Sequence, residues 1–131
     1  SMDQVAGVAL AVERGFSRIA VTVALPNDAK AIRKIHPATV IFGVHVTGLT
    51  KEEAETLVSA CDLVTSCASK TIRDAVGGRA LVQAGVAIPV FAMTVRGKEL
   101  IIEKIRQGNE PVLVKPTKLP SLSGDQPGPL V

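Results

Sequence analysis

Aromatic side chains are almost absent from this sequence, which contains three Phe and neither Trp nor Tyr. Proteins that bind single-stranded nucleic acid usually stack the bases on aromatic side chains. Lys and Arg are scattered as well, and no basic block is longer than the Arg33-Lys34 pair, although the formal net charge is +3. We therefore expect a weakly cationic, solvated surface, with no nucleic acid among the partners.

Long hydrophobic runs are also missing. Apolar residues make up 47% of the chain, but charged or turn residues interrupt every apolar segment before it reaches the roughly 18 residues of a membrane span. The apolar residues are therefore assigned to the core of a water-soluble protein, and no membrane partner is expected. With 131 residues, the chain has the length of one domain.

Cysteine is scarce, because only Cys61 and Cys67 are present. Two cysteines do not form a disulfide framework, and no signal peptide precedes the domain, so a reducing cytoplasmic location is predicted. Residues 1–2 are interpreted as a remnant of expression and residues 3–116 as the domain. Residues 117–131 are rich in Pro, Gly and Ser without periodicity, which predicts a flexible or docking tail.

Between these ends, apolar residues alternate between helical spacing and short continuous runs. Helical spacing over residues 3–15 has Asp3 as N-cap and Gly15 after the last turn, and Thr50 to Glu53 forms a capping box. The further predicted helices are 27–36, 69–85 with a break at Gly77-Gly78, and 98–107. The predicted strands are 18–24, 39–47, 63–66, 88–94 and an edge strand over 111–115.

This alternation predicts a three-layer α/β fold. Apolar strands that are each followed by an amphipathic helix are typical of a mostly parallel, Rossmann-like sheet of four to five strands, with helices on both faces. A half-barrel fragment is the alternative. Because the pattern begins with a helix, the domain is either the C-terminal part of a longer protein or a fold that starts with that helix.

Polar side chains follow the predicted strands at their carboxyl ends, where open parallel sheets bind ligands. They are hydroxyl, imidazole, thiol and cationic groups in an otherwise apolar pattern. The candidate site residues are His45, Thr47, Ser66, Cys67, Ser69, Lys70, Thr71, Thr94 and Arg96. Neither a P-loop nor a dinucleotide-binding glycine motif is present, so no cofactor is assigned.

Two kinds of chemistry are open at this edge. Ser69 or Thr71 at a helix start, with Lys70 beside them, would hold a phosphate or carboxylate; the alternative is an ordinary N-cap with a solvated Lys. Cys67 lies where the helix dipole and Lys70 favour its thiolate, so with His45 as base it is a candidate catalytic nucleophile; the alternative is a structural cysteine.

Other residues are excluded from these roles. Cys61 continues a helical apolar stripe and is predicted to belong to the core. His45 and Cys67 alone supply too few ligands for a metal site, so none is predicted. The acidic residues lie mostly on helix surfaces, which leaves two-metal and glycosidase chemistry without support.

Several segments carry a family resemblance. These segments are IAVTVA, IFGVHVTGL, TSCASKT, GGRALVQAGVAIPVFAMT, RGKELI and PVLVKP. Together they resemble the C-terminal region of the eighth methanogenesis marker protein, an uncharacterised family of methanogenic archaea. The resemblance extends to about Pro120. It implies a longer protein with an N-terminal part and a supporting role in methanogenesis, and it implies no established activity.

Three hypotheses therefore remain. The domain binds a small anionic ligand or cofactor at the carboxyl ends of the strands, or it is an enzyme that uses Cys67 with His45. In the third, it is an assembly domain without catalysis, whose first helix and tail contact an N-terminal region of the same protein or a second copy in a homodimer.

Overall fold

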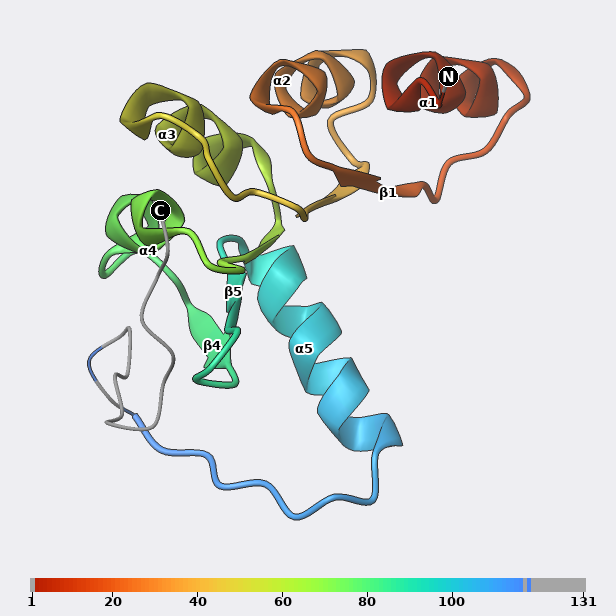
Figure 1. Cartoon of the computed structure of the whole chain (residues 1–131). Helices are drawn as coiled ribbons and strands as arrows, with labels where there is room; N and C mark the ends of the chain where they lie inside the picture. Colours follow the sequence, from red (N-terminus) through yellow and green to blue (C-terminus); the bar gives the residue numbers. More distant parts are fainter. Residues whose placement is uncertain (1, 117, 119–131) are drawn as a thin grey trace.

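The computed structural model describes residues 2–116 and 118, and these residues form an alternation of helices and strands (Figure 1). Five helices and five strands are present in this part of the chain. The elements are α1 (Gln4–Glu13), β1 (Ala20–Val23), α2 (Pro26–Ile35), β2 (Val40–Gly43), α3 (Lys51–Ala60), β3 (Leu63–Thr65), α4 (Lys70–Val76), β4 (Val82–Ala84), β5 (Val90–Ala92) and α5 (Val95–Gln107).

The strands form one open sheet in the order β1-β2-β3-β5-β4. β1, β2 and β3 are parallel neighbours, whereas β5 runs antiparallel to both β3 and β4. The predicted three-layer α/β class is confirmed, with an open sheet. The strand predicted over 88–94 forms as β5, but it is not parallel to the others, because β4 and β5 form a hairpin and not a parallel crossover.

Helices cover the two faces of the sheet unequally. α1, α2, α3 and α4 lie in a row on one face, and α5 lies on the other (Figure 1). The larger core lies under the row of four and includes the fully buried Ile32, Ile41, Leu57, Ile72 and Phe91. The smaller core lies under α5 and contains Leu63, Ala92 and Ile101.

Side-chain caps define where the helices begin. Asp3 accepts a hydrogen bond from the Ala6 N–H, and Thr50 forms the complete capping box with Glu53, so both predicted caps are confirmed. Thr94 caps α5 by accepting from the Gly97 N–H, which starts this helix three residues before the predicted Lys98. A side-chain oxygen at the N-cap satisfies an N–H that has no partner within the helix.

Two predicted elements were wrong. The helix predicted over 69–85 ends at Val76, because Gly77 has φ +48°, and the chain then turns into β4, whose preceding residue Leu81 donates its N–H to Ala92 O. The edge strand predicted over 111–115 does not form; that segment is exposed and pairs with no strand among residues 2–116. A β-branched run becomes a strand only where a sheet edge is available to pair with it.

The tail predicted for 117–131 lies outside the described residues apart from Lys118, and Ser1 lies outside them as well. In the part of the chain that the structure covers, no helix has the length and apolar character required to cross a lipid bilayer.

Candidate functional site

The carboxyl ends of β2 and β3 carry the two most reactive side chains of the predicted site. His45 lies two residues after β2, and Cys67 lies two residues after β3. Both have a positive φ, 56° for His45 and 44° for Cys67, and no other described non-glycine residue does. A side chain in this left-handed region costs of order 1 kcal/mol, because Cβ approaches the backbone carbonyl oxygen.

Cys67 is held by short contacts within its own loop. Its N–H donates to Thr65 Oγ1 at 3.2 Å, and the same hydroxyl lies 3.5 Å from Cys67 Sγ. Ser66 Oγ donates to the Cys67 carbonyl oxygen at 3.3 Å, and the Ser66 N–H donates to Pro89 O, which ties the loop to the β4–β5 turn. The Cys67 side chain remains half-buried, so it is both positioned and accessible.

The N-cap position of α4 is satisfied by the protein's own side chain. Ser69 is fully buried, and its Oγ accepts from the Ile72 N–H at 3.2 Å. Lys70 forms an exposed ion pair with Asp74 at 2.6 Å, one helical turn further on. The cation predicted to attract an anion to this loop is therefore engaged along the outside of α4. Thr71 follows it and is half-buried.

Arg73 was not singled out from the sequence, although the structure brings it to the same end of the molecule. Its Nη2 donates to Ala87 O in the β4–β5 turn at 3.2 Å. Its Nε is buried and has no hydrogen-bond partner among the described residues. An Arg one turn into a helix that follows a strand was the available sequence signal; the hairpin that holds its guanidinium was not predicted.

Thr94 and Arg96 do not join this edge. Both follow β5, and because β5 runs opposite to β1, β2 and β3, its carboxyl end lies at the amino edge of the parallel strands. The prediction that placed them with His45 and Cys67 was wrong for this reason. Arg96 instead lines an open depression of about 540 Å³ on α5, together with Val95, Glu99, Leu100 and Glu103.

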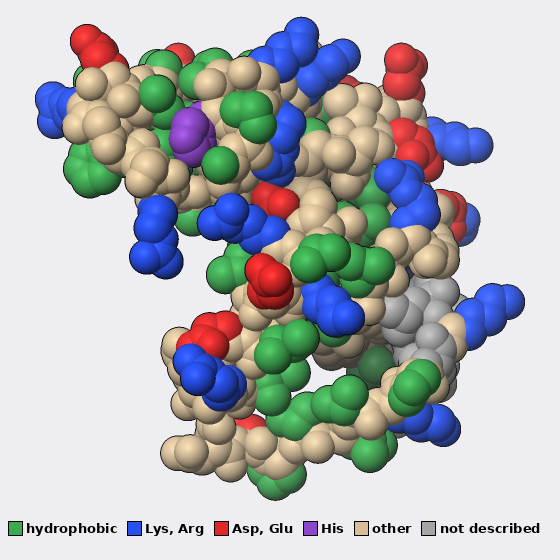
Figure 2. Space-filling view, turned by 180° about the vertical axis from the view of Figure 1, so that it is seen from behind, with side chains coloured by type: hydrophobic (Ala, Val, Ile, Leu, Met, Phe, Trp, Pro, Cys, Tyr) green, Lys and Arg blue, Asp and Glu red, His purple; other side chains and the backbone are tan. Residues whose placement is uncertain are grey.

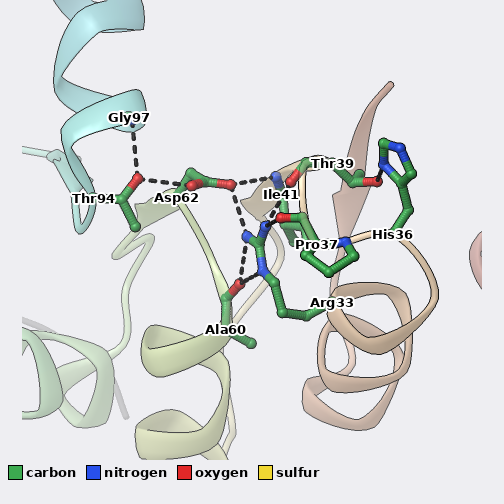
Figure 3. A network of polar contacts seen from close by, with 9 residues as sticks. All are labelled: Arg33, His36, Pro37, Thr39, Ile41, Ala60, Asp62, Thr94 and Gly97. Atoms are coloured by element: carbon green, nitrogen blue, oxygen red, sulfur yellow. Dashed lines mark hydrogen bonds and ion pairs between the residues drawn. The ribbon is translucent and has the colours of Figure 1, made fainter. Parts of the chain in front are cut away.

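A polar network occupies the amino edge and is centred on Asp62 (Figure 3). The Asp62 side chain is buried just before β3, and both its oxygens are used. Oδ1 accepts from the Thr94 hydroxyl at 2.7 Å, and Oδ2 accepts from the Ile41 N–H at 2.9 Å and from Arg33 Nη2 at 2.8 Å. Burial would raise the pKa of Asp62, but these hydrogen bonds outweigh it and hold that pKa below its ordinary value.

Arg33 completes this network, and all five of its N–H donors are used. Besides Asp62, its guanidinium donates to three backbone carbonyl groups at 2.6–3.2 Å, those of Pro37, Thr39 and Ala60. No donor remains for a ligand. The network therefore joins α2, α3, β2, β3 and the start of α5, and its role is structural.

Cys61 is a core residue, as predicted. Its side chain is 1% exposed, and burial together with the neighbouring Asp62 carboxylate raises the pKa of its thiol to about 12. Both cysteines are free. Within the described residues, no group of three or more His, Cys, Asp or Glu side chains is placed to hold a metal ion.

Comparison with known proteins identifies the family. Residues 1–106 match the family described as an uncharacterised protein conserved in archaea (DUF2099). The chain belongs to this family. An uncharacterised protein of Methanocaldococcus jannaschii is 38% identical over 133 residues, a match that covers 99% of this chain and 46% of that relative. The chain thus spans less than half the length of this relative. No solved structure matches the chain.

Proposed function

We propose that this domain of the archaeal family binds a small anionic ligand, or the anionic part of a cofactor, at the carboxyl ends of β2 and β3. The observation that carries the proposal is that two neighbouring parallel strands each run into a strained non-glycine residue, His45 and Cys67. Strained backbone is retained mainly where a binding or catalytic geometry requires it. The carboxyl edge is also where open α/β sheets bind their ligands.

The charge at this edge supports an anion. Arg73 is fixed there by one hydrogen bond, from Nη2 to Ala87 O. Its Nε has no partner among the described residues, but it is buried, so a ligand would be contacted by the terminal nitrogens of the guanidinium. A guanidinium with unused donors matches the planar geometry of a carboxylate or phosphate. The other candidates follow the same two strands in sequence and are Thr47, Ser66, Ser69, Lys70 and Thr71. The hydroxyls of Ser66 and Ser69 and the ammonium group of Lys70 are already engaged.

The test is an NMR titration with inorganic phosphate, pyrophosphate and sulfate. We expect saturable shifts of the amides of Cys67 and Ala68 and of the Arg73 guanidinium. Arg73→Met should weaken binding at least tenfold. Arg106→Met, which removes an exposed guanidinium that is paired with Glu103 on α5, is the matched control and should leave binding unchanged. Shifts that are confined to Arg96 and α5, or no saturable shift at all, contradict the proposal.

A thiol-dependent reaction is the second candidate, favoured by the positioned and half-buried Cys67 Sγ beside Thr65 Oγ1. In this hypothesis His45 acts as the base, brought to Cys67 when substrate binds. Iodoacetamide at neutral pH should then modify Cys67 and spare Cys61, whose buried thiol serves as an internal control. Peptide mass spectrometry measures both rates. If His45→Ala leaves the Cys67 rate unchanged, the pairing of the two residues is refuted.

We further propose that the domain acts in the cytoplasm and supports methanogenesis. Its two free cysteines are consistent with a reducing compartment. The methanogenic role rests on the resemblance of its sequence segments, together with a relative in Methanocaldococcus jannaschii. Depletion of a family member in a methanogen should lower methane formation per cell before protein synthesis falls. Unchanged methane formation after depletion argues against this role.

A further inference from the structure

One edge of the sheet is left open at β1. Among the described residues β1 pairs only with β2, and it is the terminal strand of the sheet. Ile19 O and Val23 O accept hydrogen bonds from the Val40 and Val44 N–H groups at 2.9 Å. Because backbone groups alternate in direction along a strand, the N–H groups of Ala20 and Thr22 point to the open edge.

The helix above this edge is only partly covered, since it packs on α2 and β1 and leaves its outer side exposed. α1 (QVAGVALAVE) carries one charged residue, Glu13, and buries only Val8. Ala6, Gly7 and Ala9 are exposed, and Leu10 is 46% exposed. A helix that is apolar on all sides normally has contacts on several of them. α1 lies at the outer end of the helical row and reaches past β1, where no described strand lies beneath it (Figure 1).

The other helices of the row show how a helix on this face connects two neighbouring strands. α2 connects β1 to β2, and α3 connects β2 to β3, and each of these strand pairs is parallel and adjacent. A strand, a crossover helix and a parallel strand form such a unit with right-handed connection almost without exception. α1 stands in the same row and leads into β1. By the same rule, a strand that preceded α1 in a longer chain would lie beside β1.

We propose that the free edge of β1 binds a further parallel strand, supplied by the segment that precedes α1 in longer members of this family. More than half of the Methanocaldococcus jannaschii relative lies outside the match to this chain, which is ample length for such a strand. The strand would pair with the backbone of Ala20 and Thr22 and would bury the underside of α1.

The open sheet face extends this surface. The side chains of Ala20 and Thr22 are exposed on the face opposite α1, where Val40 and Phe42 are only partly buried. α5 contacts β5 and β4 on that face, and Phe42 of β2 packs at the margin of the core under α5, whereas β1 lies beyond this helix (Figure 1). Figure 2 shows an indentation between the end of the molecule that carries α1 and α2 and the helix α5, with hydrophobic side chains at its margin. Residues that accompany the added strand would cover this face.

A second copy fits the edge less well. Two β1 strands paired about a two-fold axis run antiparallel, with the helical rows of both copies on one face. The α1 helix of each copy would then reach over the β1 of the other, where α1 and α2 of that copy already lie. A single strand without its own helix on that face avoids this overlap.

Amide hydrogen exchange measured by NMR tests the proposal. In this chain alone, the amides of Val21 and Val23 should be protected by β2, while those of Ala20 and Thr22 exchange at least a hundredfold faster. In the intact relative, the positions that align with all four residues should be protected alike. Fast exchange there at the positions of Ala20 and Thr22 overturns the proposal. Protection of these two amides in this chain that rises with protein concentration also overturns it, because a second copy then occupies the edge.

A pair of proline variants gives an independent readout. Thr22→Pro removes an N–H that has no strand partner among the described residues and should leave the chain folded, whereas Val21→Pro removes a β1–β2 hydrogen bond and should unfold it. In the intact relative, proline at the position of Thr22 should lower the protection of the segment before α1 at least tenfold. Unchanged protection of that segment contradicts the pairing.

Discussion

The network around Asp62 makes a quantitative prediction about stability. In Asp62→Asn, an amide replaces the carboxylate, so the buried Ile41 N–H, the Thr94 hydroxyl and Arg33 Nη2 lose the charged acceptor that they share. Removing one partner of a buried, hydrogen-bonded charge pair costs about 3–5 kcal/mol. Arg33 keeps its bonds to three carbonyl groups, and its side chain is 30% exposed. We therefore take the lower end, about 3 kcal/mol, which lowers the melting temperature by about 10 °C in a domain of this size.

The assay is urea unfolding followed by circular dichroism. Glu55→Ala is the matched control, because it removes an ion pair of the same length, 2.8 Å, between α3 and the loop after α4, whose side chains are both 47% exposed. Exposed pairs contribute less than about 1 kcal/mol. If Asp62→Asn lowers the free energy of unfolding no more than Glu55→Ala does, the reasoning is refuted, because the Asp62 carboxylate then contributes no more than a surface charge.

The pH dependence provides a second check on the same variant. The folded-state pKa of Asp62 lies below its ordinary value, so its ionised form stabilises the fold above the unfolded-state pKa of about 3.9. This contribution is lost as the pH falls through the lowered pKa of the folded state. The difference between the wild type and Asp62→Asn should be constant from pH 7 to about pH 5 and should shrink below pH 4. A difference that grows as the pH falls would contradict this assignment.

Two further predictions concern single backbone positions. A Cβ at Gly97 would overlap the Asp62 carbonyl oxygen, so Gly97→Ala should lower the free energy of unfolding by about 2 kcal/mol despite the better helix propensity of Ala. In α1, a Cβ at Gly7 meets nothing within 4 Å, so Gly7→Ala should raise the free energy of unfolding by about 0.5–1 kcal/mol. Equal effects of the two variants in thermal melts would exclude the close approach at Gly97. His45→Gly should raise the free energy of unfolding by up to about 1 kcal/mol, because glycine adopts φ 56° without strain, while binding of phosphate becomes weaker. Lower stability of His45→Gly would show that the imidazole, and not the strained backbone, dominates at this position.

The local elements followed from local signals in the sequence. The caps at Asp3 and Thr50 depend on side chains three residues from the N–H groups that donate to them. The short apolar runs predicted β1, β2 and β3 as strands, but the full burial expected of such runs does not hold for β1, whose Ala20 and Thr22 are exposed. The core position of Cys61 followed from helical spacing. These features involve neighbours in sequence, so periodicity and capping rules were sufficient to predict them.

The tertiary structure alone decided the direction of β5 and therefore the membership of the site. An apolar run such as that of β5 has the same composition in either direction, and the hairpin that reverses it depends on the pairing of residues 82–84 with 90–92. This pairing moved Thr94 to Asp62 and brought Ala87 to Arg73. Contacts between residues 14–32 positions apart depend on how the strands close on one another, which no local pattern specifies.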